Sequence, residues 1–199
     1  MIGIIGGSGI YNLSNITVLD SFEITTPFGA PSDLISKIII QDQEMLFLPR
    51  HGSNHSFTPS KVNYRANICA MKMLGAKGIL SFSACGSLRE EFKPGDFVLV
   101  DQFLDFTKLR ASTFFDESIV AHVGMGDPSC NALRAILLNE LKKLDISFHH
   151  GGAYVAIEGP QFSSKKESLI FKDVFKCDVI GMTNMPEAKL AREAELCYQ

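Results

Sequence analysis

Short apolar runs bounded by polar turns dominate the first half of the chain. Residues 2–5, 34–40 and 44–48 are apolar runs of strand length, and they predict buried strands. Between residue 60 and Gly75 the apolar positions recur at helical spacing instead, and the glycine ends the pattern. The face of this helix predicted to be buried consists of Val62, Ala66, Cys69, Ala70 and Met73.

The second half continues the alternation of strands and helices. The predicted strands are residues 78–84, 97–100, 153–157 and 178–181. Ser129 is predicted to cap one helix, and residues 164–175 to form another. The face predicted to be buried in the first of these consists of Leu133, Ile136, Leu137, Leu141 and Leu144. A final helix is predicted to open at Pro186 and Glu187 and to run into residues 196–198.

This alternation predicts a single α/β domain over residues 1–199 with a largely parallel sheet. The sheet is predicted to be mixed, because residues 18–48 have the character of an antiparallel hairpin. Ligands of open α/β sheets bind beyond the carboxyl ends of the strands, where loops meet. The loops predicted to share that edge are residues 6–9, 50–55, 83–87 and 182–186.

Residues 47–67 combine basic side chains with a complete lack of acidic ones. The cationic or potentially cationic residues are Arg50, His51, His55, Lys61 and Arg65. Charge without an internal partner favours an external anion, and a guanidinium fork matches phosphate oxygens. The segment therefore predicts a phosphate site that includes Arg50, with a solvated basic surface as the alternative.

The glycine-rich turn at residues 6–9 is a second candidate for anion binding. It follows a predicted strand, and its N–H groups together with the Ser8 hydroxyl can surround an anion. The dinucleotide-binding pattern GxGxxG fails here, because a pattern starting at Gly7 and Gly9 needs glycine where the chain has Asn12.

Composition narrows the function classes. A formal net charge of −3 argues against a general nucleic-acid binder, and 46% hydrophobic content suits one buried core. No apolar run approaches the roughly 18 residues of a membrane span, and the N-terminus lacks the basic flank of a signal peptide. We therefore expect a cytoplasmic protein without membrane or nucleic-acid partners.

The cysteines predict neither disulfides nor a metal site. They stand at positions 69, 85, 130, 177 and 197, an odd number without zinc-ligand spacing, and they are predicted to be reduced thiols. Cys85 lies within a turn and is the one candidate nucleophile, although packing as a small residue is the favoured interpretation.

Several of these segments together resemble a known family. They include GIIGGSGIY at residues 3–11, LPRHGSNH at 48–55, SACGSL at 83–88, EGPQFSS at 158–164 and IGMTNMPEAKLAREAELCY at 180–198. The chain resembles the 5'-methylthioadenosine phosphorylase branch of the purine nucleoside phosphorylases over essentially its whole length. The resemblance implies a three-layer α/β/α phosphorylase fold with a mixed, largely parallel central sheet. It also implies a homotrimer, no metal, and no cofactor besides phosphate as co-substrate.

The implied reaction is phosphorolysis, in which phosphate attacks the anomeric carbon of a purine nucleoside and releases the base. The positions that match the family's phosphate ligands are Ser8, Arg50, His51, Ser83, Ala84 and Thr183. The other basic residues of the segment 47–67, namely His55, Lys61 and Arg65, are interpreted as structural or surface residues. Met182 matches a residue that contacts the sugar, and Phe162 one that packs on the substrate. His122 matches a histidine that reaches the 5'-substituent pocket of a neighbouring subunit. Ser163 stands where the 6-oxopurine branch commonly has glutamate, which favours the methylthio-nucleoside branch.

Family members continue beyond the position of Tyr198 into a strand, an acidic base-recognition loop and further helices. On this pattern the C-terminal strand and helices are expected to be missing, and the base-recognition Asp lies beyond Gln199. No catalytic residue is therefore assigned, and residues 1–199 alone are expected to have little activity. The preference for adenine or hypoxanthine stays open, because GMTNMPEA also resembles methylthioinosine phosphorylases.

Three other functions stay open as alternatives. A general 6-oxopurine nucleoside phosphorylase would use the same phosphate site with another base. A nucleosidase would use water as the nucleophile, which the predicted phosphate ligands argue against. A phosphate-binding remnant would bind the anion without catalysis.

Overall fold

The computed structural model describes residues 1–7, 16–117 and 119–199. Among these residues, six strands form the first sheet in the order β12-β5-β1-β4-β3-β2. Their bounds are Ile2–Gly6 for β1, Thr17–Phe22 for β2, Ile35–Ile40 for β3, Gln43–Pro49 for β4, Gly78–Phe82 for β5 and Cys197–Tyr198 for β12. The first four strands in that order are parallel, whereas β3 and β2 are antiparallel, which confirms the mixed character predicted for residues 18–48.

The remaining strands form a second sheet and a separate pair. The second sheet has the order β6-β11-β10-β8, and β7 pairs with β9. The bounds are Gly86–Ser87 for β6, Phe97–Leu99 for β7, Gln102–Asp105 for β8, Phe148–His150 for β9, Ala153–Ala156 for β10 and Val179–Gly181 for β11. One central sheet was predicted, so the division into two sheets is a correction.

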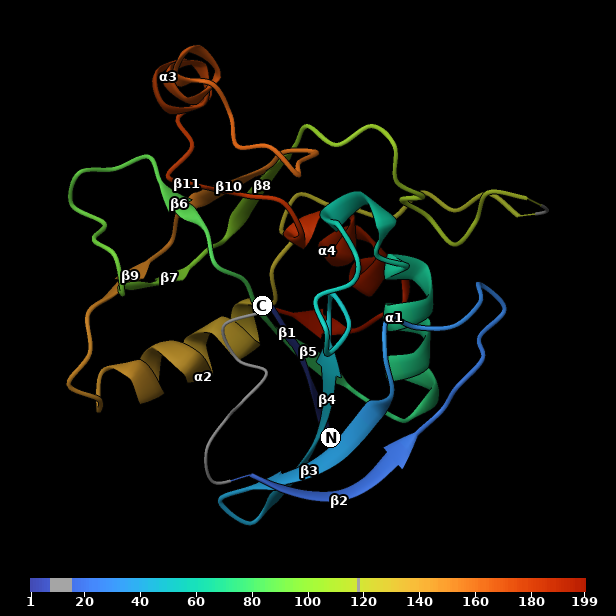
Figure 1. Ribbon diagram of the computed structural model, residues 1–199. Helices are drawn as coiled ribbons and strands as arrows, with labels where there is room; N and C mark the ends of the chain where they lie inside the picture. The colour runs from blue at the N-terminus through green and yellow to red at the C-terminus, as the bar shows by residue number, and fades with distance from the viewer. Residues whose placement is uncertain (8–15, 118) are drawn as a thin grey trace.

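The helix α4 (Asn184–Glu193) explains this division. It lies between the two sheets, where it contacts β12 on one side and β8 on the other (Figure 1). Ala188, Leu190 and Ala191 are fully buried in α4, within a core cluster to which both sheets contribute. A helix that is apolar on more than one side needs cover from more than one side, and the two sheets provide it.

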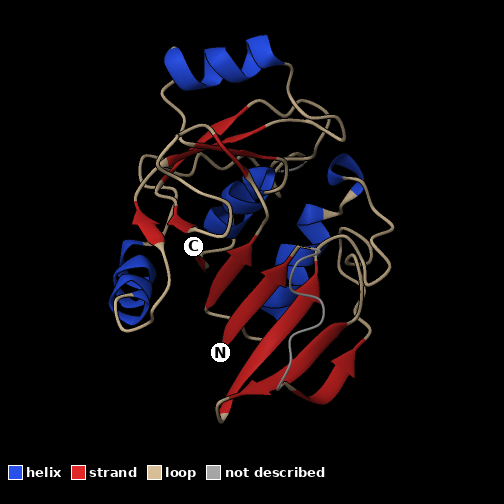
Figure 2. Cartoon of the chain, turned by 60° about the vertical axis from the view of Figure 1, so that its left-hand side comes forward, coloured by secondary structure: helices blue, strands red, loops and turns tan. Residues whose placement is uncertain are grey.

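The other helices cover the outer faces. The helix α1 (Tyr64–Met73) packs beside α4, and α3 (Lys165–Asp173) covers the far side of the second sheet, at the top of Figure 2. Ser164 caps α3 with a capping box to Glu167, as the predicted helix start at residue 164 implies. Sheets and helices thus form the layered α/β architecture that was predicted.

The buried face of α1 differs from the prediction. Met73 is 57% exposed, whereas Ile68 and Met71 are fully buried. Pro59–Lys61 form a separate 3-10 turn (η2), and Asn63 caps α1 by accepting from the Ala66 N–H, so the helix begins later than predicted. Side chains keep fixed positions around a helix axis, and packing against the core selects the face that carries Ile68 and Met71.

The prediction for the helix after Ser129 is wrong in its cap and its burial. Cys130 is the N-cap of α2 (Asn131–Leu141), and no residue within α2 is buried. Ile136 and Leu144, both predicted to be buried, are 59% and 57% exposed. The first turn of α2 is held at the sheet, where the Cys130 N–H donates to the Tyr198 carbonyl over 2.8 Å.

The end of the chain corrects two further predictions. The helix α4 stops at Glu193, and the next residues form β12 beside β5. Cys197 and Tyr198, predicted to lie at the end of the final helix, thus belong to a strand. Cys197 is also joined to Cys130 by a disulfide, with 5.1 Å between the Cα atoms, so the prediction of five reduced thiols is wrong for this pair. Cys69, Cys85 and Cys177 are free.

Candidate functional site

The parallel strands β1, β4 and β5 bring the three loops that follow them to the same edge of the sheet. Gly6 pairs with Pro49 of β4 on one side and with Phe82 of β5 on the other. The residues that follow, Gly7, Arg50 and Ser83, are therefore neighbours although they lie far apart in the sequence. Hydrogen bonds from the Gly7 N–H to the Phe82 carbonyl (3.0 Å) and from the Arg50 N–H to the Gly6 carbonyl (2.9 Å) fix this arrangement.

A cavity of about 690 Å3 opens at this edge and extends to the end of β11. It is lined by every predicted phosphate ligand that the structure describes, namely Arg50, His51, Ser83, Ala84 and Thr183. Ser8, the sixth, lies outside the described residues. The prediction that the loops share one edge is therefore confirmed for the described part of each loop.

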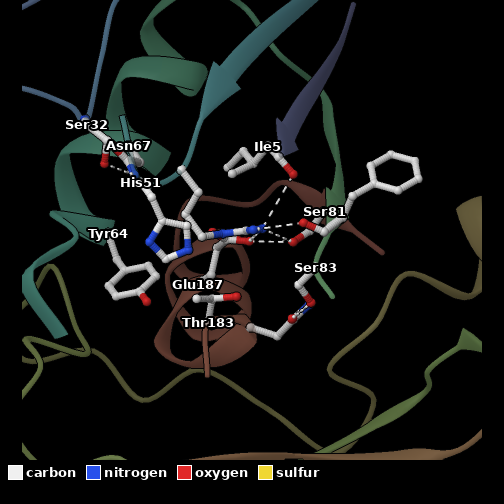
Figure 3. Close-up of polar contacts among 12 residues, drawn as sticks. Ile5, Ser32, His51, Tyr64, Asn67, Ser81, Ser83, Thr183 and Glu187 are labelled. Atoms are coloured by element: carbon white, nitrogen blue, oxygen red, sulfur yellow. Dashed lines mark hydrogen bonds and ion pairs between the residues drawn. The ribbon is translucent and has the colours of Figure 1, made fainter. Parts of the chain in front are cut away.

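Arg50 lies at the base of the cavity and is fully buried. Its Nε donates to Glu187 Oε2 over 2.8 Å, and its Nη2 donates to Glu187 Oε1 over 2.9 Å. Nη2 also donates to Ser81 Oγ (2.7 Å), and Nη1 donates to the Phe82 carbonyl (2.8 Å). Figure 3 shows Ser81 and Glu187 converging on this guanidinium.

These contacts correct the predicted geometry at Arg50. The paired edge of the guanidinium, predicted to bind phosphate through two hydrogen bonds, is occupied by Glu187. None of the described residues accepts from the second N–H of Nη1, on the side where Arg50 lines the cavity. Arg50 can therefore offer an anion one N–H and a nearby positive charge.

Glu187, the partner of Arg50, is a residue that the sequence analysis did not assign to the site. It is fully buried, and its Oε1 also accepts from Ser81 Oγ (2.6 Å) and from the Tyr198 hydroxyl (2.8 Å). A buried carboxylate with this many donors secures the orientation of its arginine partner. The signal in the sequence was an acid beside Pro186 in a motif segment, which was interpreted only as a helix start.

His51 is buried and lines the cavity beside Arg50. Its Nδ1 lies 2.8 Å from the Phe57 carbonyl, which can only accept, so Nδ1 carries the proton. Burial lowers the pKa of His51, and the charge of Arg50 lowers it further. The ring lies 4.7 Å from that of His55, which also lines the cavity, although His55 had been interpreted as a structural or surface residue.

The other two cationic residues of the segment 47–67 lie away from the cavity lining. Arg65 pairs with Asp116 over 2.8 Å and lies over the Phe28 ring. Lys61 ends the η2 turn. The cationic segment thus divides into cavity residues and surface residues, in line with the prediction for these two.

The turn after β11 carries Met182 and Thr183. Thr183 is buried, and its N–H donates to the Tyr154 hydroxyl over 3.2 Å. Met182 packs against Gly159, whose φ of +68° and missing side chain permit the approach, since a Cβ there would lie 2.5 Å from the Met182 Sδ. Both residues line the cavity beside the loops that are predicted to bind phosphate.

Phe162 and Ser163 lie at the mouth of the cavity. The Phe162 ring is 91% exposed, so it is available to pack on a ligand. The Ser163 hydroxyl lies 2.7 Å from that of Ser168. His122 lies in an exposed loop and does not line the cavity.

Cys85 lines the cavity and is exposed there. This corrects the interpretation of Cys85 as a packed residue.

Arg110 is a second residue that the sequence analysis missed. Its side chain is 2% exposed, and it donates to the carbonyls of Met185 (2.7 Å) and Glu158 (2.8 Å). Its Nε pairs with the Glu158 carboxylate over 3.2 Å, while Glu158 also bonds Ser60. Arg110 therefore joins three segments around the cavity. No local pattern around residue 110 distinguishes it from a surface arginine.

Comparison with known proteins gives consistent matches. Residues 1–199 match the family described as the phosphorylase superfamily. The S-methyl-5'-thioadenosine phosphorylase of Hyperthermus butylicus is 51% identical over 197 residues, covering 99% of this chain and 72% of the relative. That of Saccharolobus solfataricus is 50% identical, covering 99% and 73%. Methylthioadenosine phosphorylase from Schistosoma mansoni, solved in complex with adenine, superposes with a TM-score of 0.94 at 39% identity, covering 99% and 78%.

Proposed function

The chain belongs to the phosphorylase superfamily, among the S-methyl-5'-thioadenosine phosphorylases, and on that premise we propose that it acts in the phosphorolysis of 5'-methylthioadenosine. Phosphate attacks the anomeric carbon, the bond to the base breaks, and adenine and 5-methylthioribose 1-phosphate are released. One observation carries the proposal: Arg50, His51, Ser83, Ala84 and Thr183, which come from separate loops, line one cavity.

The cavity suits a reaction that depends on positioning. The ribosyl transition state has oxocarbenium character, so a phosphate held beneath the sugar stabilises positive charge and supplies the nucleophile. Arg50 contributes charge and one N–H, while its orientation is secured by Glu187. We assign the Ala84 N–H and the Thr183 hydroxyl to the remaining oxygens, and Ser8 and His51 to the same site.

The nucleoside is proposed to lie between the phosphate and the cavity mouth. Met182 would contact the sugar, and the exposed Phe162 ring would pack on the substrate. His122, which lies outside this cavity, is proposed to reach the 5'-substituent of a neighbouring subunit in a homotrimer. The reaction as proposed needs no cofactor besides phosphate as co-substrate.

The mouth of the cavity supports a methylthio-nucleoside over a 6-oxopurine nucleoside. Ser163 offers no carboxylate to the N1–H of hypoxanthine or guanine, and its hydroxyl is already bonded to Ser168. Asn184, within the segment GMTNMPEA that also resembles methylthioinosine phosphorylases, is buried beside Ser83 and Tyr198. Its side chain therefore cannot contact the base directly.

No helix in the described part of the chain is long and apolar enough to cross a membrane. A cytoplasmic location is proposed, in keeping with a small metabolite as the substrate. In such a compartment the Cys130–Cys197 bond would respond to the thiol redox state.

The test is base release by the purified protein from methylthioadenosine, with and without phosphate. Release that requires phosphate supports the proposal, and release without phosphate would identify a nucleosidase. Phosphate binding without release would identify a phosphate-binding protein in place of an enzyme.

Two variants sharpen the test. Arg50→Ala is expected to weaken phosphate binding at least tenfold, because the buried charge and its N–H are lost. Lys61→Ala is the matched control in the same cationic segment and is expected to leave phosphate affinity unchanged. Equal losses measured by calorimetry would mean that the segment acts as a diffuse basic surface.

A further inference from the structure

A chain of buried hydrogen bonds connects the Arg50–Glu187 pair to the Ser83 hydroxyl at the cavity wall. The Tyr198 hydroxyl donates to Glu187 Oε1 over 2.8 Å, and Asn184 Nδ2 donates to the Tyr198 oxygen over 3.1 Å. Ser83 Oγ then donates to Asn184 Oδ1 over 2.7 Å. Glu187, Tyr198 and Asn184 are 0%, 2% and 4% exposed, so water has little access to this relay.

The direction of every proton in the relay follows from Glu187. Paired with Arg50 through both oxygens, its carboxylate can only accept. Burial and the nearby Glu187 charge raise the pKa of Tyr198 well above its usual range, so the phenol stays neutral and gives its one proton to Glu187.

The same reasoning continues to the cavity. Once the Tyr198 proton is used, its oxygen must accept, and Asn184 turns its NH2 group toward it. The amide oxygen then faces Ser83 and takes the single hydroxyl proton of that residue. Ser83 is left with lone pairs toward the cavity.

We propose that Ser83 accepts a hydrogen bond from a protonated oxygen of the bound anion, which makes the site selective for hydrogen phosphate over sulfate. The inference rests on the proposed function, since it specifies the form of the phosphate substrate. Hydrogen phosphate keeps a proton at neutral pH, whereas sulfate has none and would place lone pair against lone pair. Binding the protonated oxygen at Ser83 leaves the unprotonated oxygens for Arg50, the Ala84 N–H and attack on the sugar.

The first test compares the affinities of inorganic phosphate and sulfate for the purified protein by calorimetry at constant ionic strength. The unmodified protein is expected to prefer phosphate. Ser83→Ala is expected to lose about tenfold in phosphate affinity and little in sulfate affinity, so the ratio of the two affinities falls about tenfold. If Ser83 instead donates to the anion, Ser83→Ala weakens both anions alike and the ratio stays constant, which overturns the proposal.

The second test interrupts the relay at Tyr198, which does not line the cavity. In Tyr198→Phe the Asn184 amide loses the acceptor that orients it, and it can rotate and let Ser83 donate. Sulfate affinity is expected to rise relative to phosphate. Tyr64→Phe removes another buried hydroxyl, which bonds the Pro59 carbonyl, and should keep the original ratio.

The outcomes separate this inference from the proposed function. A protein that binds phosphate and sulfate equally well, or a Tyr198→Phe variant with the original ratio, overturns the inference and leaves phosphorolysis standing. A protein that binds neither anion overturns both. If Tyr198→Phe fails to fold, the ratio of phosphate to sulfate affinity in Ser83→Ala still decides whether the inference holds.

Discussion

Arg50 and Glu187 form an ion pair in which both side chains are fully buried. A buried charge is costly unless it is paired and hydrogen-bonded, and here each partner satisfies the other. The pair lies beneath the phosphate loops, so the contacts that stabilise it also orient the cationic group proposed to attract phosphate. At the scale of single residues, stability and function depend on the same atoms.

Glu187→Gln tests this dependence. The variant keeps the shape of the side chain but leaves the buried Arg50 charge without its counter-charge, and we expect a loss of about 3 to 5 kcal/mol in the free energy of unfolding. Urea denaturation measures it. Glu140→Gln is the matched control, because the Glu140–Lys143 pair is exposed. It should cost at most about 1 kcal/mol. Equal effects would mean that the buried pair contributes no more than a surface pair.

His51 gives a prediction for pH. Its folded-state pKa is lowered, chiefly by burial. The unfolded chain then binds the proton more readily, so the contribution of neutral His51 to stability is present above the unfolded pKa of about 6.5 and is lost as the pH falls through the folded value. We expect His51→Gln to flatten the fall of the unfolding free energy as the pH is lowered below about 6.5.

The control for that measurement is His150→Gln, since His150 is exposed at the end of β9. This variant should keep the slope of the parent protein. A slope unaffected by His51→Gln would assign the pH dependence to other groups.

Elements far apart in the chain meet at the cavity, and Arg110 holds three of them. It connects its own loop to Glu158, which follows β10, and to the kinked start of α4 at Met185. Its planar fork reaches several carbonyls at once, which a lysine ammonium cannot do from one position. The loop that carries Met182 and Thr183 is therefore positioned by a residue that does not line the cavity.

Arg110→Lys is expected to reduce kcat/KM for methylthioadenosine at least tenfold, with a larger rise in KM for the nucleoside than for phosphate. The reason is that the lost carbonyl contacts lie beside the residues proposed to bind the sugar. Steady-state kinetics with each substrate varied in turn measures the split. Arg89→Lys is the control, because Arg89 pairs with Asp178 at the surface. A uniform loss of kcat without a KM effect would show that Arg110 acts on stability alone.

At the scale of the molecule, α4 packs between the two larger sheets of the described residues, and the chain end is anchored to the first of them. The disulfide Cys130–Cys197 links β12 to the start of α2 across 67 residues of sequence. Such a covalent link restricts the unfolded chain far more than it changes the folded one. Stability at this scale thus depends on the thiol redox state as well as on the core.

Cys130→Ser is expected to lower the free energy of unfolding under oxidising conditions by about 2 to 4 kcal/mol, because the closed loop is long. Denaturant unfolding with and without reductant measures the change. Cys69→Ser, which removes a free thiol, should behave like the parent protein. A parent protein whose stability is unaffected by reductant would contradict the predicted contribution.

Local sequence patterns determined several strands, the location of the candidate site and the family. Apolar runs predicted β1, β3, β4 and β5, because a strand of this length needs an apolar side wherever it is buried. The ends of parallel strands coincide, so the phosphate loops could be placed at one edge before any side chain was located. The residue types and their order in the chain were then sufficient to identify the family.

Only the tertiary structure decided which partners those residues take. Arg50 and Glu187 are 137 positions apart, and no periodicity predicts that a glutamate would occupy the guanidinium edge expected to bind phosphate. The same holds for the Cys130–Cys197 bond, for the exposed face of α2 and for the position of α4 between two sheets. Hydrophobic spacing specifies which side of an element is apolar, whereas long-range packing selects what covers that side and which buried charges meet.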